Sequence, residues 1–252
     1  LLELGGEQQM ISLGERNEGY LAKVGEPLIQ FYGYKTCGVW NSAEEIAANP
    51  HFSDDAPGGI RIVDTNNDGS LTPEDRVALG TPYPDFTWGI TNTFQIKDFD
   101  ISFLIQGVQG ITVLNGDVYY NETKKWNKKY TKNRWVSAEH PGDGKTPYQN
   151  VKTGHDLMLT DYPLQNASYA CLRNFTVGYT LPATAARKIK LSGVRFYVSG
   201  SNLLYIWGSG YKGINPESRM TSGNYSSAMI SGYQRGGFPL TSTISAGFDI
   251  NF

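Results

Sequence analysis

The sequence has few charged residues, few cysteines and histidines, and no long run of apolar residues. Charged side chains make up 18% of the 252 residues, below the roughly 25% that is usual for soluble domains. The 22 basic and 24 acidic side chains leave a net charge of −2, so no overall field draws the chain to nucleic acid. The 2 Cys and 3 His are too few for a disulfide scaffold or a Cys/His metal framework. No apolar run approaches the ~18 residues of a membrane helix, which excludes helical membrane spans.

Aromatic residues and glycine are abundant, and the main pattern is an alternation of apolar and polar residues. Aromatics reach 13%, with 16 Tyr, 11 Phe and 5 Trp, and there are 29 Gly. Apolar residues occupy mostly even positions between 86 and 96, and odd positions between 99 and 105. This period of two predicts half-buried strands, and Lys97-Asp98 between the segments predicts a hairpin turn. Asp98 tolerates the left-handed conformation of such a turn.

The same alternation predicts further strands at residues 169–181, 194–201 and 243–252. A less regular strand is expected at 28–36, and another within 1–13. The clearest strands run for about 9–12 residues, longer than the usual 5–6 and close to the ~9–11 that cross a bilayer. Their polar faces carry Thr, Ser, Gly, Asn and Gln, which suit a watery lumen, and their apolar faces carry Phe, Ile, Val and Tyr, which suit lipid.

Short and long connections alternate between these strands. Outer-membrane barrels alternate short periplasmic turns with long external loops. The short connections are 97–98 and 182–193, and the long ones are 37–85, 109–168 and 205–240. A soluble β-sandwich would have mostly short connections and rarely contains such long excursions. The sequence therefore predicts an all-β fold, a transmembrane antiparallel β-barrel with extracellular loops and a periplasmic C-terminus.

The predicted strands are too few to close such a barrel. About six or seven are found, whereas about eight is the usual minimum. An open sheet would leave backbone groups unpaired in the hydrocarbon. The chain also begins at Leu1 without an initiator Met or a signal segment. We therefore expect residues 1–252 to be the C-terminal segment of a longer barrel, completed by an N-terminal part that holds the plug and the other strands.

Several segments, taken in order, resemble the C-terminal region of SusC/RagA-type TonB-dependent outer-membrane transporters. They are Val24–Tyr34, Asp64–Gly69, Gly80–Gly89, Leu172–Pro182, Val194–Leu203 and the closing strand to Phe252. The resemblance implies a barrel of about 22 strands, an N-terminal plug, and a segment that contacts the TonB complex. It also implies a SusD-like surface lipoprotein that closes the barrel as a lid, and import of oligosaccharides or peptides driven through TonB.

The segment from Asp64 to Asp75 has the spacing of a calcium-binding loop. Such loops place ligands at positions 1, 3, 5, 7 and 12 and a glycine at position 6. The corresponding residues are Asp64, Asn66, Asp68, the backbone carbonyl of Ser70, and Asp75, with Gly69 at position 6. Thr72 and Pro73 also predict a helix start. The alternative is a metal-free loop held by turns of its own Asp and Asn side chains. A structural Ca²⁺ is the one cofactor that we expect, with no organic cofactor.

Aromatic residues in the long connections are candidates for contact with a substrate or with the lid lipoprotein. They are Tyr119, Tyr120, Trp126 and Trp135 in one connection, and Tyr211 and Tyr233 in another. Aromatic rings stack on sugar rings, and Tyr and Trp are enriched in protein interfaces. Packing within the loops is the alternative. For the first connection, we favour loop packing and partner contact over direct contact with the substrate.

The C-terminal Phe252 resembles the terminal aromatic by which barrel proteins are handed to the outer-membrane assembly machinery. The alternative role for Phe252 is an anchor at the membrane interface. Cys171 shares the odd, lipid-facing positions of its strand, so we expect Cys37 and Cys171 to stay free thiols even in an oxidising compartment.

The sequence contains no recognisable catalytic constellation. His51, His140 and His155 are isolated, and no Gly-x-Ser-x-Gly motif is present. We therefore expect no enzyme activity. The favoured hypothesis is a nutrient importer in the outer membrane of a Gram-negative bacterium, in contact with the lipid bilayer and not with nucleic acid. The alternative is a secreted calcium-binding β-sandwich that binds glycans.

Overall fold

The computed structural model describes residues 8–13, 18–118, 132–149, 156–208, 210–219 and 232–252. The chain forms two compact units. The first comprises Leu1–Tyr83, Ile111–Asn166 and Glu217–Gly237, and the second comprises Pro84–Gly110, Ala167–Pro216 and Phe238–Phe252. No helix in these described ranges is long and apolar enough to cross a membrane.

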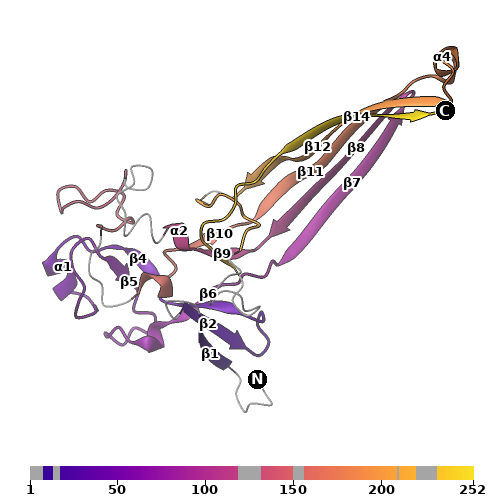
Figure 1. Cartoon of the computed structure of the whole chain (residues 1–252). Helices are drawn as coiled ribbons and strands as arrows, with labels where there is room; N and C mark the ends of the chain where they lie inside the picture. The colour runs from indigo at the N-terminus through magenta and orange to yellow at the C-terminus, as the bar shows by residue number, and fades with distance from the viewer. Residues whose placement is uncertain (1–7, 14–17, 119–131, 150–155, 209, 220–231) are drawn as a thin grey trace. The chain divides into compact units, whose positions relative to one another are not determined.

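The second unit is an antiparallel sheet of 5 strands in the order β14-β12-β11-β8-β7. The strands are β7 (Phe86–Ile96), β8 (Phe99–Gln109), β11 (Tyr169–Thr180), β12 (Gly193–Trp207) and β14 (Thr243–Asn251). Figure 1 shows them side by side as one long sheet. Each strand falls on a segment where apolar and polar residues alternate, so the strands predicted in this part of the chain are confirmed.

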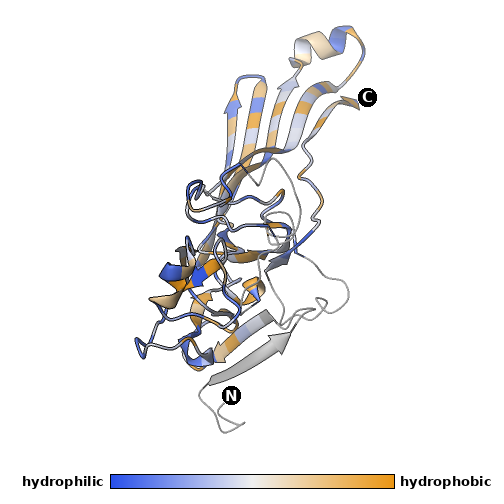
Figure 2. Ribbon diagram, turned by 90° about the vertical axis from the view of Figure 1, so that its left-hand side faces the viewer, coloured by the Kyte–Doolittle hydropathy of each residue, from blue (hydrophilic) through white to orange (hydrophobic). Residues whose placement is uncertain are grey.

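The register gives this sheet an apolar face and a polar face, because residues directly opposite on antiparallel neighbours point to the same side. The apolar face consists of Phe86, Trp88, Ile90, Phe94, Ile96, Phe99, Ile101, Phe103, Ile105, Leu172, Phe175, Val177, Tyr179, Val194, Phe196, Val198, Leu204, Ile206, Ile244, Ala246, Phe248 and Ile250. Many of these side chains are exposed in this chain, and Figure 2 shows the alternation along the strands. An apolar surface of this extent marks contact with lipid or with another protein.

A β-bulge in β11 corrects one predicted face. Leu172 lies opposite Ile105 and Asn174 lies opposite Leu104, so Arg173 is one extra residue relative to β8. An extra residue exchanges the two faces for everything beyond it. Tyr169 and Cys171 therefore lie on the polar face, and the prediction that Cys171 faces lipid with Phe175, Val177, Tyr179 and Leu181 is wrong. Among the described residues, neither Cys37 nor Cys171 forms a disulfide, but the reason that the sequence suggested does not hold for Cys171.

The short connections of the sheet lie at one end. In the turn between β7 and β8, the residue with a positive φ is Lys97 at 55°, whereas the sequence pointed to Asp98. The connection between β11 and β12 contains the short helix α4 (Ala183–Lys188). Figure 1 places α4 and the C-terminus at the same end of the sheet as this turn, as the alternation of short and long connections predicts.

The first unit is built from short elements. Its strands are β1 (Gln8–Leu13), β2 (Glu18–Lys23), β3 (Gln30–Gly33), β4 (Thr36–Val39), β5 (Ile60–Ile62), β6 (Val77–Gly80), β9 (Thr112–Asn115), β10 (Leu164–Asn166) and β13 (Tyr233–Gln234). Its helical segments are α1 (Ala43–Ala47), η2 (Pro73–Asp75), α2 (Gly116–Val118) and η4 (Leu157–Leu159). The strands form the sheets β1-β2-β3-β6, β10-β9-β13 and β4-β5.

This unit has its own hydrophobic core, which includes Tyr20, Phe31, Tyr34 and Ile60. The strand predicted at 28–36 is found as β3, and the strand expected within 1–13 is found as β1. The segments 37–85 and 109–168, which the sequence predicts as long loops, contain short strands and helices that pack on this core. The long connections are therefore structured in their described parts.

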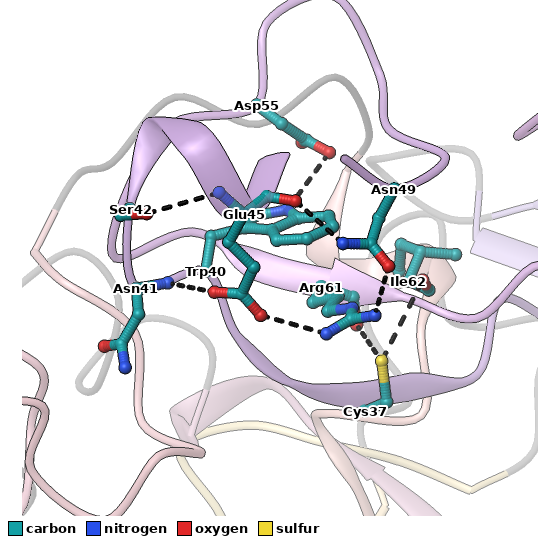
Figure 3. A network of polar contacts seen from close by, with 9 residues as sticks. All are labelled: Cys37, Trp40, Asn41, Ser42, Glu45, Asn49, Asp55, Arg61 and Ile62. Atoms are coloured by element: carbon teal, nitrogen blue, oxygen red, sulfur yellow. Dashed lines mark hydrogen bonds and ion pairs between the residues drawn. The ribbon is translucent and has the colours of Figure 1, made fainter. Parts of the chain in front are cut away.

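A polar network holds α1 against the neighbouring strands (Figure 3). Ser42 is the N-cap residue, and its Oγ accepts a hydrogen bond of 3.2 Å from the backbone N–H of Glu45. The Glu45 carboxylate accepts from the backbone N–H of Asn41 at 2.8 Å and pairs with Arg61 at 3.0 Å. The Arg61 guanidinium lies 4.8 Å from the ring centroid of the buried Trp40. These contacts fix the local structure without an unpaired charge on Arg61 or Glu45.

The two faces of β8 lead to a first prediction. Phe103 belongs to the apolar face, whereas its neighbour Ser102 points to the polar face. If the apolar face meets lipid, Phe103→Arg should cost about 2–4 kcal/mol, because it places a charge in the hydrocarbon. Ser102→Arg should be much milder. Heat-modifiable gel migration of the intact protein in membranes measures both, and equal losses of folded protein would contradict the assigned faces.

Candidate functional site

The polar face of the five-stranded sheet is the surface that the sequence predicts to line a lumen. A row of hydroxyl-bearing residues crosses its middle, with each residue directly opposite the next on the neighbouring strand. This hydroxyl row consists of Thr93, Ser102, Thr176, Ser199 and Ser245. Paired residues on adjacent strands lie about 4.5–5.5 Å apart, so the row is a continuous band of uncharged hydrogen-bonding groups.

Charged residues gather on the polar face near the short connections. Arg195 on β12 pairs with Asp100 on β8 at 2.7 Å and with Asp249 on β14 at 3.4 Å. The pair with Asp100 crosses β11 at Gly178, where an added Cβ would collide with Asp100 Oδ1 and with the Arg195 guanidinium. A glycine is therefore needed at this position because the ion pair occupies the space of a side chain.

The β11 bulge gathers polar and aromatic side chains at the other end of the polar face. Arg173 donates to Asn202 Oδ1 at 2.8 Å and to the Tyr205 hydroxyl at 2.7 Å. When the side-chain amide of Gln106 is oriented with its oxygen towards Arg173, this oxygen accepts hydrogen bonds from the Arg173 guanidinium at 2.6 Å and 3.2 Å. The register between β11 and β12 also shifts here, at residues 202 and 203 of β12. Asn202 in this shift has a positive φ of 53°. Arg173 thus joins three strands at the point where their register shifts.

Aromatic rings lie beyond this bulge, at the long-loop end of the polar face. Tyr169 is directly opposite Trp207 on the neighbouring strand, and Tyr205 lies 6.0 Å from Tyr169 between ring centroids. Trp207 is 41% exposed, although it points away from the apolar face. Tyr169, Tyr205 and Trp207 are not among the contact residues that the sequence predicts. The signal available was Arg173 itself, since a charge among apolar odd positions indicates a shift in register.

The predicted contact aromatics occupy packed positions where the structure describes them. Trp135 and Tyr233 are buried in the core of the first unit, and the Trp135 indole N–H donates to Asn41 Oδ1 at 2.8 Å. Tyr211 is buried too, edge-on to Trp207 at 6.1 Å. These rings support their own segments, as in the loop-packing alternative. Contact with a substrate or lid stays a prediction for them, and Tyr119, Tyr120 and Trp126 lie outside the described residues.

The loop from Asp64 to Asp75 is held by its own side chains. The Asp64 carboxylate accepts from the N–H groups of Asn67 and Gly69 at 2.7 Å and 2.8 Å. Asn66 Oδ1 accepts from Asp68 N–H at 3.0 Å, and Asp68 Oδ1 from Ser70 N–H at 2.8 Å. The oxygens of Asp64, Asn66 and Asp68 thus order the loop through its backbone, and they are the oxygen type that Ca²⁺ prefers.

Asp75 has a different role from the other acidic residues of this loop. Its fully buried carboxylate accepts from the N–H groups of Thr65 and Thr72, both at 2.8 Å. Thr72 is the N-cap of η2 with Pro73 in the first turn and a reciprocal capping box to Asp75, so the predicted helix start is confirmed. Burial acts to raise the pKa of Asp75, but hydrogen bonds from three backbone N–H groups outweigh it and hold the pKa below its usual range.

The fit of calcium to this loop is therefore partial. Asp64, Asn66 and Asp68 lie on one short turn with oxygens of suitable chemistry, whereas the Asp75 carboxylate is engaged in capping. Within the described residues, no three Asp, Glu, His or Cys side chains converge as a metal site. Calcium binding stays a prediction, and calorimetry with Ca²⁺ on the intact, chelator-treated protein tests it. If the protein releases no more heat of binding than an Asp64→Asn variant, the loop does not bind calcium.

Phe252 follows β14 and is exposed. The alternation of β14 would extend the apolar face to this residue, which is compatible with both an interface anchor and an assembly signal. The signal role stays a prediction.

No protein-family model matches the chain. TonB-dependent receptor P26 of Formosa agariphila is 31% identical over 239 residues, which are 91% of this chain and 23% of that protein. TonB-dependent receptor P3 of the same organism is 30% identical over 92% of this chain and 23% of its own length. TonB-dependent receptor SusC of Bacteroides thetaiotaomicron is 27% identical over 62% of this chain and 15% of its own length. The chain thus spans about a quarter of the length of its curated relatives.

Solved structures show the same fold. The RagAB peptide transporter matches 98% of this chain and 25% of its own, with a TM-score of 0.70 and 19% identity. The RagAB peptide importer in its open-open state matches 100% of this chain and 25% of its own, with a TM-score of 0.69 and 18% identity. These matches cover both the sheet and the first unit, so they confirm the predicted fold class.

The crossing of the ion pair over Gly178 leads to a second prediction. Gly178→Ala should destabilise the sheet by about 1–3 kcal/mol, as expected for overpacking, because Asp100 and Arg195 must move apart. Gly89→Ala is the matched control, since it also lies on the polar face and an added Cβ there meets nothing closer than 3.8 Å. The melting temperature of the intact protein measures both, and equal melting would rule out the steric conflict.

The buried Asp75 carboxylate leads to a third prediction. Asp75→Ala should increase hydrogen exchange at residues 64–75, because losing the acceptor of buried N–H groups costs about 1–3 kcal/mol. Glu74→Ala, at an exposed neighbour, is the control.

The same carboxylate predicts a pH dependence. Since the folded pKa lies below the ordinary 3.8, the stabilisation is present above that value and declines as the pH falls towards the folded pKa. The measurement is the protection of residues 64–75 from hydrogen exchange, relative to the intrinsic exchange rate at each pH. Equal protection above pH 3.8 and well below it would contradict this role.

Proposed function

We propose a role in nutrient import from one premise: the chain belongs to the SusC/RagA type of TonB-dependent receptors, as a C-terminal part of the barrel. Receptors of this type are outer-membrane proteins. Together with an N-terminal part that supplies the plug and the remaining strands, the whole protein imports oligosaccharides or peptides. A SusD-like surface lipoprotein acts as its lid, and the TonB complex drives it from the periplasm.

The observation that carries this proposal is the division of the sheet into two faces. The apolar face presents exposed Phe, Ile, Val and Leu side chains on β7, β12 and β14. A soluble sandwich would bury such a face against a second sheet. In the described part of the chain, residues such as Phe94, Phe248 and Ile244 instead remain exposed. This favours lipid contact over the secreted β-sandwich.

The polar face supports passage of an uncharged, hydrogen-bonding solute. The hydroxyl row offers donors and acceptors without a fixed charge in the middle of the wall. The charges of Arg195, Asp100 and Asp249 are paired with one another near the short connections. Trp207 and Tyr205 add aromatic surface at the long-loop end, where a solute would enter. Both sugar hydroxyls and peptide amides suit such a wall.

Orientation follows from the connections. Short turns of outer-membrane barrels face the periplasm, so the end with Lys97 and α4 is assigned to the periplasmic side. The long connections and the first unit are then extracellular, and a calcium ion at the Asp64–Asp75 loop would order part of that unit. The curated relatives are TonB-dependent receptors, so the proposal includes no enzyme activity.

Uptake measurements test the import function. A strain that lacks the full-length gene should lose uptake of one class of oligomer from a panel of oligosaccharides and peptides, and the intact gene should restore it. Unchanged uptake of the whole panel at a verified outer-membrane level would reject import as the function.

A second experiment tests whether the solute contacts the polar face of the sheet. Replacing the hydroxyl row by Thr→Val and Ser→Ala should raise the half-saturating concentration for uptake several-fold. The control set Ile101→Val, Val177→Ile and Val198→Ile lies on the apolar face and should leave uptake unchanged. Equal uptake by both sets, at equal outer-membrane levels, would show that the solute does not contact this wall.

A further inference from the structure

The connection between β11 and β12 is strongly basic. Residues 181–192 contain Arg187, Lys188 and Lys190 and no acidic residue. All three basic side chains are exposed. Arg187 and Lys188 lie in the last turn of α4, where cations interact favourably with the helix dipole. Lys190 follows the helix, with a φ of 60°, so the dipole does not account for the whole cluster.

The apolar face is covered at the point where this connection joins β12. Val194 belongs to the apolar face but is only 6% exposed, whereas Phe196 and Val198 on the same face and strand are 50% and 53% exposed. The helix α4 packs against β12, and Ala186 within it is fully buried. Figure 1 shows α4 at the tip of the sheet. The basic cluster therefore lies where the apolar face ends.

An exposed apolar residue sits inside the basic cluster. Ile189 is 57% exposed and lies between Lys188 and Lys190 in the sequence. Segments that rest at the membrane interface combine apolar side chains, which enter the acyl boundary, with Lys and Arg, whose charged ends reach the headgroups. The chemistry that suits three exposed cations beside a lipid-facing surface is an anionic phosphate.

We propose that Arg187, Lys188 and Lys190 form a binding site for the phosphate of an anionic phospholipid headgroup, with Ile189 inserted at the acyl boundary. The inference rests on the lipid-facing fold and on the proposed orientation, which places the site at the periplasmic leaflet, and it does not depend on the imported solute. The site anchors the short-connection end of the barrel at a fixed depth and retains anionic phospholipid around it.

The experiment uses the intact transporter in nanodiscs that contain equal amounts of phosphatidylglycerol and phosphatidylcholine. Native mass spectrometry of the released protein measures which lipids remain bound. Wild type should retain phosphatidylglycerol several-fold over phosphatidylcholine. The variant Arg187→Gln, Lys188→Gln, Lys190→Gln should lose this preference.

A matched control removes the same charge elsewhere. Lys23→Gln, Lys145→Gln and Arg219→Gln change three exposed basic residues outside this connection and should keep the wild-type preference. Heat-modifiable migration confirms that both variants are folded. The proposal is overturned if the α4 variant still selects phosphatidylglycerol, or if wild type retains phosphatidylglycerol and phosphatidylcholine equally. Uptake is measured separately, so a failure of the import function would leave the lipid result intact.

Discussion

Backbone hydrogen bonding in a medium without water is the constraint on which the rest of this structure depends. In hydrocarbon every N–H and C=O must pair within the protein, and strands satisfy this only when both of their edges have neighbours. In the five-stranded sheet, β11, β12 and β8 have neighbours on both sides, while β14 and β7 are the edge strands. Long strands, one apolar face, and turns and loops confined to the ends all follow from this requirement. The chain makes physical sense as part of a larger closed wall.

The alternation of side chains predicted most of this wall from sequence. The faces of β7, of β14 and of β12 up to Ser201 are as the period of two indicates, because no residue is inserted where these segments pair with β8 or with each other. The prediction failed for Tyr169 and Cys171, since periodicity does not show where an extra residue enters a strand. The bulge at Arg173 is a tertiary feature, fixed by hydrogen bonds to Asn202 and Tyr205 on a neighbouring strand.

The long connections were harder to predict for a different physical reason. Strands such as β5 and β10 contain 3 residues each, too few for a clear period, and their core is assembled from residues far apart in the chain. Local signals did succeed where the chemistry is local: Thr72 and Pro73 mark the start of η2. The same loop also shows how one spacing supports two interpretations, because the Asp75 predicted as a ligand serves as a buried cap.

The register shift at Arg173 has a consequence for how this wall can change in length. Between the hydroxyl row and the row of Tyr169 and Trp207, β11 uses one residue more than β8, and β12 uses one residue more than β11. Gaining or losing a single residue in this stretch of β11 would exchange its lumenal and lipid-facing sides, whereas a change of two would preserve them. Among homologues, length variation here should therefore come in even steps, and an odd step should be accompanied by a swap of polar and apolar residues along the rest of the strand.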